Sequence, residues 1–242
     1  MITYVIIGCV GALVLLLCLC LAIASFAGEN FYQMHEKNNK IQNSRGISTM
    51  QYVQAINKTY FENSLKIARC EKYQDHYSQG MVALSNDTMY SNSLTSFATV
   101  SHELGHAKQD QEGDKLKKHL KLRKNGRRLG RLFMPFMLVG AVLGALYAFG
   151  VLNHLAVLIS AFSCMGLSLL IFFFALYLKY KEIEIEKEAS DYAIEFLKEV
   201  LSRSEVDECK DFLDSARLTY WAVLFKTMLG WTMLTKKDKM FR

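Results

Sequence analysis

Charged residues are missing from two long stretches of this 242-residue chain. The first stretch is Ile2–Gly28, and the second covers the 47 residues of Leu132–Leu178. Soluble proteins do not gather their apolar residues in this way, whereas a helix that crosses a bilayer core of about 30 Å needs roughly 20 of them. The first stretch is therefore expected to cross a membrane once. The second is expected to cross it twice, as a helical hairpin that turns near Gly150–His154.

Acidic residues are missing from residues 115–131, the basic cluster of the chain. The cluster holds nine positive charges, from Lys115, Lys117, Lys118, Lys121, Arg123, Lys124, Arg127, Arg128 and Arg131. Without it the chain would have 20 basic against 23 acidic residues, so the formal net charge of +6 arises in one place. The cluster ends where the second apolar stretch begins, as cytoplasmic charge beside a membrane span does. It also lacks aromatic residues that could stack on bases, so we expect a lipid partner and no nucleic acid.

A disulfide framework is missing as well, because four of the six cysteines lie inside the apolar stretches. Only Cys70 and Cys209 have polar surroundings, which is unlike a small secreted protein. The N-terminus has no basic residue before its apolar run, and that run is about twice as long as the core of a signal peptide. We therefore predict that the first stretch is a permanent membrane anchor.

The segment His102–His106 reads HELGH and carries the clearest chemical pattern. A helix is expected over Ser93–Gln111, and residues four apart on a helix share a face. The two imidazoles can then bind one metal ion, while Glu103 reaches the water that the ion activates. A catalytic zinc ion combines such a pair with a third protein ligand and an open position for water. The remaining histidines lack this spacing and are expected to be surface, structural or loop residues: His35, His76, His119 and His154.

A third ligand is expected from the helix that begins near Lys179. At 100° per residue, Glu186 shares a stripe with small and apolar residues, namely Ala189, Ser190, Ala193, Leu197 and Val200. The opposite, solvated face carries Glu184, Glu188, Glu195 and Glu199. A carboxylate on a buried stripe is costly unless it pairs with a basic side chain or binds a metal. Glu186 is therefore the predicted third ligand, and Glu182, one turn earlier on the same stripe, is the alternative.

The segment between the first apolar stretch and the HELGH motif predicts several short elements. Glu29–Arg45 has no strong periodicity and is expected to be a linker. Ser48 and Gln51 form a capping box, which predicts the start of an amphipathic helix of about five turns. Leu65–Ala68 and Met81–Leu84 are short apolar runs around a polar, turn-rich segment, which predicts a small hairpin or pair of strands. A peptide substrate is expected to lie extended against Met81–Leu84 and to add a strand there.

The last apolar stretch, Tyr220–Leu234, has only 15 residues and includes Lys226. A fourth crossing here would place the C-terminal basic residues opposite the basic cluster, against the orientation rule, so a helix at the interface or packed on the domain is expected. The predicted organisation is an anchor (1–28), a metallopeptidase domain in two parts (29–131 and 179–242) and a transmembrane hairpin (132–178). Because a hairpin leaves the membrane on the side it entered, both parts of the domain face the same compartment.

Six short motifs occur along most of the chain: SRGIS at 44–48, DHY at 75–77, LS at 84–85, SHELGHA at 101–107, EKEAS at 186–190 and LDSARLTY at 213–220. In these motifs the chain resembles the neutral zinc metallopeptidase family of bacterial membrane proteins, the YugP-like family. The resemblance implies a membrane peptidase in which His102, His106 and Glu186 bind Zn²⁺ and Glu103 is the general base. EKEAS is also similar to the CAAX-processing membrane peptidases, in which an aspartate follows the glutamate ligand by four residues. That position is Ser190 here.

The predicted protein is a mainly α integral membrane protein with an N-terminal span, a transmembrane helical hairpin and a zincin-like helical domain that contains a short β element. It is expected to hydrolyse peptides or proteins on the cytoplasmic side of the cell membrane. Charged residues directly after the HELGH motif disfavour an intramembrane protease of the site-2 type. Transport is disfavoured because the spans hold no acidic or basic residue except His154. A catalytically silent membrane scaffold with a structural metal site is the alternative, and the pattern predicts no oligomeric state.

Overall fold

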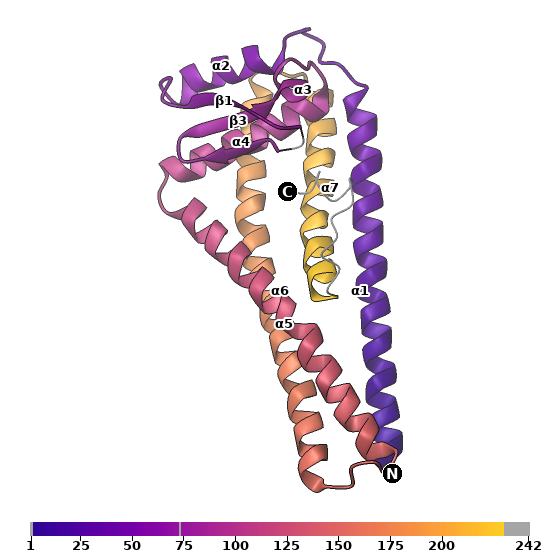
Figure 1. Ribbon diagram of the computed structural model, residues 1–242. Helices are drawn as coiled ribbons and strands as arrows, with labels where there is room; N and C mark the ends of the chain where they lie inside the picture. Colours follow the sequence, from indigo (N-terminus) through magenta and orange to yellow (C-terminus); the bar gives the residue numbers. More distant parts are fainter. Residues whose placement is uncertain (1, 73, 230–242) are drawn as a thin grey trace. The chain divides into compact units, whose positions relative to one another are not determined.

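The structure is a computed structural model that describes residues 2–72 and 74–229 (Figure 1). Its helices are α1 (Ile2–Asn39), α2 (Thr49–Tyr60), α3 (Asn86–Met89), α4 (Leu94–Gln111), α5 (Lys115–Ala148), α6 (Leu155–Lys198) and α7 (Arg203–Met228). Its strands are β1 (Lys66–Cys70), β2 (His76–Ser78) and β3 (Met81–Ser85). The protein is therefore mainly helical with one small sheet, as predicted.

The chain folds into two compact units. Among the described residues, the apolar unit contains 2–26, 122–181 and 221–229, and the mixed unit contains 27–121 and 182–220. The whole sheet and every predicted metal ligand belong to the mixed unit. Two segments separated by some 60 residues of sequence therefore meet in one compact body, and this body holds the candidate site.

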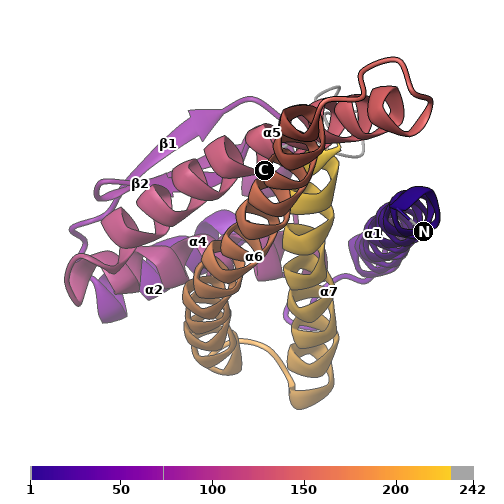
Figure 2. The same ribbon diagram turned by 90° about the horizontal axis from the view of Figure 1, so that it is seen from below.

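In the apolar unit, α5 and α6 form the predicted helical hairpin (Figure 2). A methyl group on Gly140 would lie 3.0 Å from the carbonyl oxygen of Ala161, so the two backbones approach closely at this glycine. The Ser168 hydroxyl donates a hydrogen bond to the carbonyl oxygen of Phe133 at 3.0 Å. The loop between the helices includes Gly150 at φ +73°, which confirms the turn in the predicted place.

Within the described part of the chain, α5 and α6 are long and apolar enough to cross a membrane. Only 28% of the most apolar window of α5 and 17% of that of α6 is buried. Their outer surfaces carry exposed large apolar side chains, among them Leu138, Val142, Leu170 and Phe173. Apolar surface of this extent on a monomer marks an interaction site for protein or lipid.

The other two predicted apolar segments have different outcomes. The N-terminal stretch forms the first part of the single 38-residue helix α1, and its crossing of a membrane stays a prediction. The predicted linker Glu29–Arg45 is wrong up to Asn39, because α1 continues to that residue and buries Phe31 against the ring of Phe212.

At the C-terminus, α7 ends at Met228, and residues 230–234 of the predicted apolar helix lie outside the described residues.

The sheet has the strand order β1-β3-β2. β3 pairs in parallel with β1, where Lys66 lies opposite Met81, and antiparallel with β2, where Tyr77 lies opposite Val82. The two apolar runs form a pair of strands, which confirms one of the two predicted arrangements. The other, a hairpin, is wrong, because the segment between them forms β2 and reverses the chain once more, so that β1 and β3 are parallel. Since β3 is paired on both sides, Met81–Leu84 cannot accept a peptide as an added strand, and that prediction is wrong too. The open edges of the sheet belong to β1 and β2.

Helix α2 begins as predicted and ends early. Ser48 and Gln51 form the expected capping box. The helix ends at Tyr60 after 12 residues instead of about five turns, because Glu62 and Asn63 adopt positive φ angles of 53° and 60°. A left-handed backbone cannot continue a right-handed helix.

Helix α4 forms the centre of the mixed unit and packs against β2 and β3 (Figure 1). Ser93 caps its first turn, as the predicted start of this helix requires. Phe97 and Leu104 are fully buried in the main hydrophobic core. The hydroxyl groups of Ser101 and Tyr52 form a buried hydrogen bond of 2.7 Å just before the HELGH motif. The motif therefore lies on a helix that is fixed on both sides.

Glu205 connects the SRGIS motif to the first turn of α7. Its carboxylate accepts hydrogen bonds from the backbone N–H of Ser202 at 2.8 Å and from the Ser202 hydroxyl at 2.7 Å, and it also accepts the backbone N–H of Ser44. Burial disfavours the anion, but these hydrogen bonds outweigh burial and lower the pKa of Glu205.

We predict that Glu205→Gln lowers the free energy of unfolding by roughly 1–3 kcal/mol at pH 7, because an amide satisfies these donors less well than a carboxylate. Denaturant unfolding of the full chain in detergent measures the change, and Glu195→Gln, on an exposed position of α6, is the matched control. A lowered folded-state pKa means that the contribution is complete above the ordinary carboxyl pKa of about 4.3. It is lost as the pH falls through the folded-state pKa. Equal stability of the two variants at pH 7 would contradict the assignment.

Candidate metal centre

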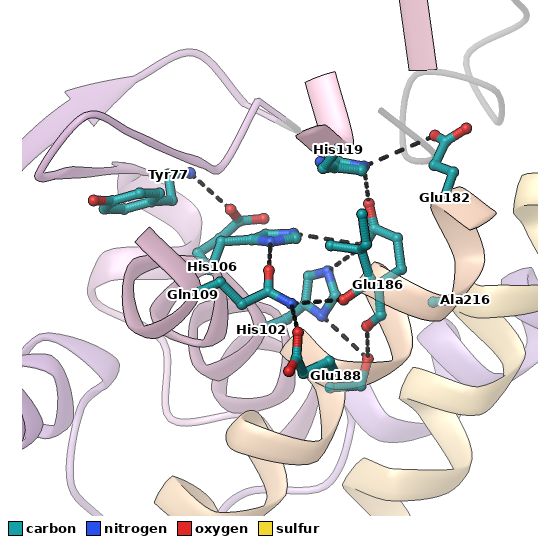
Figure 3. A network of polar contacts seen from close by, with 12 residues as sticks. Tyr77, His102, His106, Gln109, His119, Glu182, Glu186, Glu188 and Ala216 are labelled. Carbon is teal, nitrogen blue, oxygen red and sulfur yellow. Dashed lines mark hydrogen bonds and ion pairs between the residues drawn. The ribbon is translucent and has the colours of Figure 1, made fainter. Parts of the chain in front are cut away.

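The three predicted ligands meet in the mixed unit (Figure 3). The Oε2 atom of Glu186 lies 3.0 Å from Nε2 of His102 and 3.5 Å from Nε2 of His106. Ligand atoms that each lie about 2.0–2.1 Å from one tetrahedral zinc ion are roughly 3.3 Å apart. Two imidazoles and one carboxylate at this spacing therefore fit a zinc ion. They also leave the fourth position for a further ligand.

Geometry favours Glu186 over Glu182 as the acid of this cluster. Both carboxylates are buried, at 2% and 1% exposure. The carboxylate of Glu182 instead faces His119, with 3.9 Å between Oε1 and Nε2. The stripe predicted to carry Glu186 is buried along its full length, including Ala189 and Ala193.

Gln109 orients the ring of His106. The Gln109 Oε1 atom lies 3.0 Å from Nδ1 of His106 and can only accept a hydrogen bond, so Nδ1 carries the proton. The Gln109 amide group donates to the carbonyl oxygen of Ile185 at 2.7 Å and to Glu188 at 3.0 Å, which fixes the assignment of oxygen and nitrogen. With its proton on Nδ1, a neutral His106 presents the lone pair of Nε2 to the metal position.

Ser190 orients the ring of His102. The Ser190 hydroxyl donates its proton to the carbonyl oxygen of Glu186 at 3.0 Å, one turn earlier in α6. Its oxygen lies 3.2 Å from Nδ1 of His102, so it accepts a hydrogen bond from this ring nitrogen. Ser190, which follows Glu186 by four residues, thus sets the tautomer of a predicted ligand.

Glu188 departs from the sequence analysis, which placed it on a solvated face. It accepts the hydrogen bond from Gln109 and forms an ion pair of 2.6 Å with Lys115. Its side chain is 36% exposed, so this ion pair has little effect on stability by itself. The contact nevertheless holds the amide of Gln109 in place, and through it His106.

The electrostatics of the cluster show strong coupling between His106 and Glu186. Burial disfavours the charged form of His106, but the nearby Glu186 carboxylate outweighs burial and raises the pKa of His106 to about 9. Burial likewise disfavours the Glu186 anion, but His106 and His102 hold the pKa of Glu186 well below its usual range. The carboxylate is therefore charged and attracts a positive partner. A metal ion bound here would take the place of the proton on Nε2 of His106, while the Nδ1 proton would stay bonded to Gln109.

Glu103 lies on the same helix as the two histidines and is held from the sheet. The backbone N–H of Tyr77, in the edge strand β2, donates a hydrogen bond of 2.7 Å to Oε2 of Glu103. The Tyr77 hydroxyl donates to Asp110 at 2.7 Å, which ties β2 to α4 again two turns after Glu103. Tyr77 belongs to the DHY motif, so this motif orients the carboxylate of HELGH.

Gly105 explains why the third ligand reaches the other two. A Cβ atom at this position would overlap the carbonyl oxygen of Ala189 and lie 3.1 Å from its Cα. The backbones of α4 and α6 are therefore in direct contact between the two histidines. Only glycine at position 105 permits this approach, which brings Glu186 to the imidazoles.

His119, expected to be a surface, structural or loop residue, is neither at the surface nor in a loop and lies beside the predicted ligands. It is 3% exposed, its Nε2 lies 2.7 Å from Oε1 of Glu186, and its ring stacks on that of His106 at 5.5 Å. The residues around His119 in the sequence are mostly basic, so no local pattern marks it as a metal-site residue. Gln109 and Ser190 could have been found, because they stand three and four residues after His106 and Glu186 on the same helix faces.

We predict that Gly105→Ala lowers the thermal unfolding temperature and abolishes zinc binding, because the new methyl group separates α4 from α6. Zinc content is measured by elemental analysis of the purified full chain, and unfolding by circular dichroism. Gly166→Ala is the matched control, since a methyl group there meets no atom within 4 Å. In a helix this control change is neutral or slightly stabilising. A Gly105→Ala variant with normal zinc content would show that the close contact is not required.

The chain is similar to a known protein family over most of its length. No curated protein and no solved structure matches the chain. The profile of one protein family, described as "putative neutral zinc metallopeptidase", matches residues 13–235, which is nearly the entire sequence. The chain belongs to this zinc metallopeptidase family.

Proposed function

We propose that the protein is a membrane-anchored, zinc-dependent peptidase that hydrolyses peptide bonds with Glu103 as general base. The observation that carries the proposal is the meeting of Oε2 of Glu186 with Nε2 of His102 and of His106. Membership of the family implies Zn²⁺ as the cofactor and peptides as the substrate class. His102, His106 and Glu186 would hold the ion.

When bound, zinc lowers the pKa of the attacking water and polarises the scissile carbonyl group. Glu103 stands one residue from His102, and Tyr77 holds one of its two carboxylate oxygens. The carboxylate takes the proton of the attacking water and then passes it to the leaving amine. Gln109 and Ser190 keep the ligand rings in the required tautomer during this cycle.

The test is Glu103→Gln, which removes the base and leaves the three ligands in place. We expect an unchanged zinc content and a loss of casein hydrolysis of at least about 10²–10⁴-fold, the usual contribution of a general base. Glu184→Gln, an exposed acid on α6, is the control and should retain full activity. Retained turnover in Glu103→Gln would remove the assigned role. A wild-type protein that binds zinc and hydrolyses nothing would support the scaffold alternative.

The membrane part of the proposal rests on the apolar hairpin and on the basic cluster at its start. The exposed apolar surfaces of α5 and α6 suit a hydrocarbon environment, and the nine basic residues suit anionic head groups. We expect reporter fusions after residue 120 and after residue 190 to give the same cytoplasmic signal. Signals from opposite sides would contradict a hairpin.

A further inference from the structure

A second group of buried side chains with metal-ligand chemistry adjoins the first. It consists of His119 from α5 and of Glu182 and Glu186 from α6. The candidate ligand atoms of this group all lie within 4.8 Å of one another, and each residue is at most 3% exposed. Glu186 belongs to both groups.

The two oxygens of Glu186 face different histidines (Figure 3). Oε2 faces His102 and His106, whereas Oε1 lies 2.7 Å from Nε2 of His119. A carboxylate with one oxygen toward each of two ligand groups can bridge two metal ions. In two-metal hydrolases such ions lie about 3.5–4 Å apart.

His119 is a buried base whose Nδ1 has no hydrogen-bond partner among the described residues. Its Nε2 lies 2.7 Å from Oε1 of Glu186 and 3.9 Å from Oε1 of Glu182, but it is not well aligned for a hydrogen bond with either carboxylate. Nearly all buried polar side chains in native proteins bind another group, an ordered water or an ion. A cation between Nε2 and the two carboxylates would satisfy the nitrogen and explain its approach to both.

The charges of the group also favour a cation. Glu182 and Glu186 are one helical turn apart on the buried face of α6, and two carboxylates in such a place repel each other. One imidazole and two carboxylates are donors that zinc accepts, and they are the same types as in the first group.

We propose that His119, Glu182 and Glu186 form a second divalent-metal site, in which Glu186 bridges to the ion held by His102 and His106. The protein would thus bind two zinc ions. The inference rests on the proposed function for its first site and adds the second ion, with its own ligands, to it.

The test counts metal in the full chain, purified in detergent, stripped with a chelator, loaded with zinc alone and desalted. Elemental analysis is expected to give two zinc ions per wild-type chain and one per His119→Ala chain. His154→Ala, at an exposed loop histidine, is the matched control and should retain two. Replacement of zinc by Mn²⁺ provides a second measurement. Two bridged ions give an exchange-coupled electron paramagnetic resonance spectrum, whereas His119→Ala should give that of an isolated ion.

Any other zinc count overturns part of the proposal. One zinc ion in both the wild type and His119→Ala would overturn the second site and leave the peptidase proposal intact. Two ions in His119→Ala would place the second ion elsewhere and overturn the assignment. A wild type without zinc would sink the proposed function together with this inference. If His119→Ala does not fold, the zinc count and the Mn²⁺ spectrum of the wild type still decide.

Discussion

The candidate site depends on one close contact, the approach of α4 to α6 at Gly105 and Ala189. Any side chain at position 105 would overlap the backbone of Ala189. The two histidines of α4 stand on either side of this contact, and Glu186 lies three residues before it in α6. The shape of one glycine thus joins ligands that are 80 or more residues apart in the chain. The HELGH motif therefore contains two predicted metal ligands, His102 and His106, and also Gly105, whose lack of a side chain lets Glu186 approach them.

The groups that orient the ligands come from the same two helices. Gln109 follows His106 by three residues, and Ser190 follows Glu186 by four, so each extends the face that already carries a ligand. Glu103 alone is oriented from the sheet, by the backbone of Tyr77 in β2. This division would suit the proposed hydrolase, because two packed helices would hold the metal ligands while the proposed base is oriented separately, from the sheet. The last two residues of the DHY motif begin the short edge strand β2, which carries this hydrogen bond.

The helices that supply the site also continue into the apolar hairpin. α6 contains both the apolar residues up to Leu178 and the buried acids Glu182 and Glu186. α5 contains both the basic cluster, with His119 inside it, and the apolar residues after Leu132. The two helices α5 and α6 thus carry the exposed apolar surfaces, the basic cluster, the predicted ligand Glu186 and His119.

The sequence by itself determined the local features: the charge-free stretches, the capped starts of α2 and α4, the turn at Gly150, and a helix with two histidines four residues apart and a glutamate directly after the first. Each of these features depends on the spacing of residues within a single element, and this spacing can be read from periodicity and from capping residues. Periodicity also predicted the buried stripe of α6, and with it Glu186. Only the tertiary structure decided that Glu186 and not Glu182 faces His102 and His106. It alone also decided that β3 is a central strand and that His119 reaches Glu186. These relations join separate elements, and distances between elements are set by packing, such as the contact at Gly105, which no local pattern encodes.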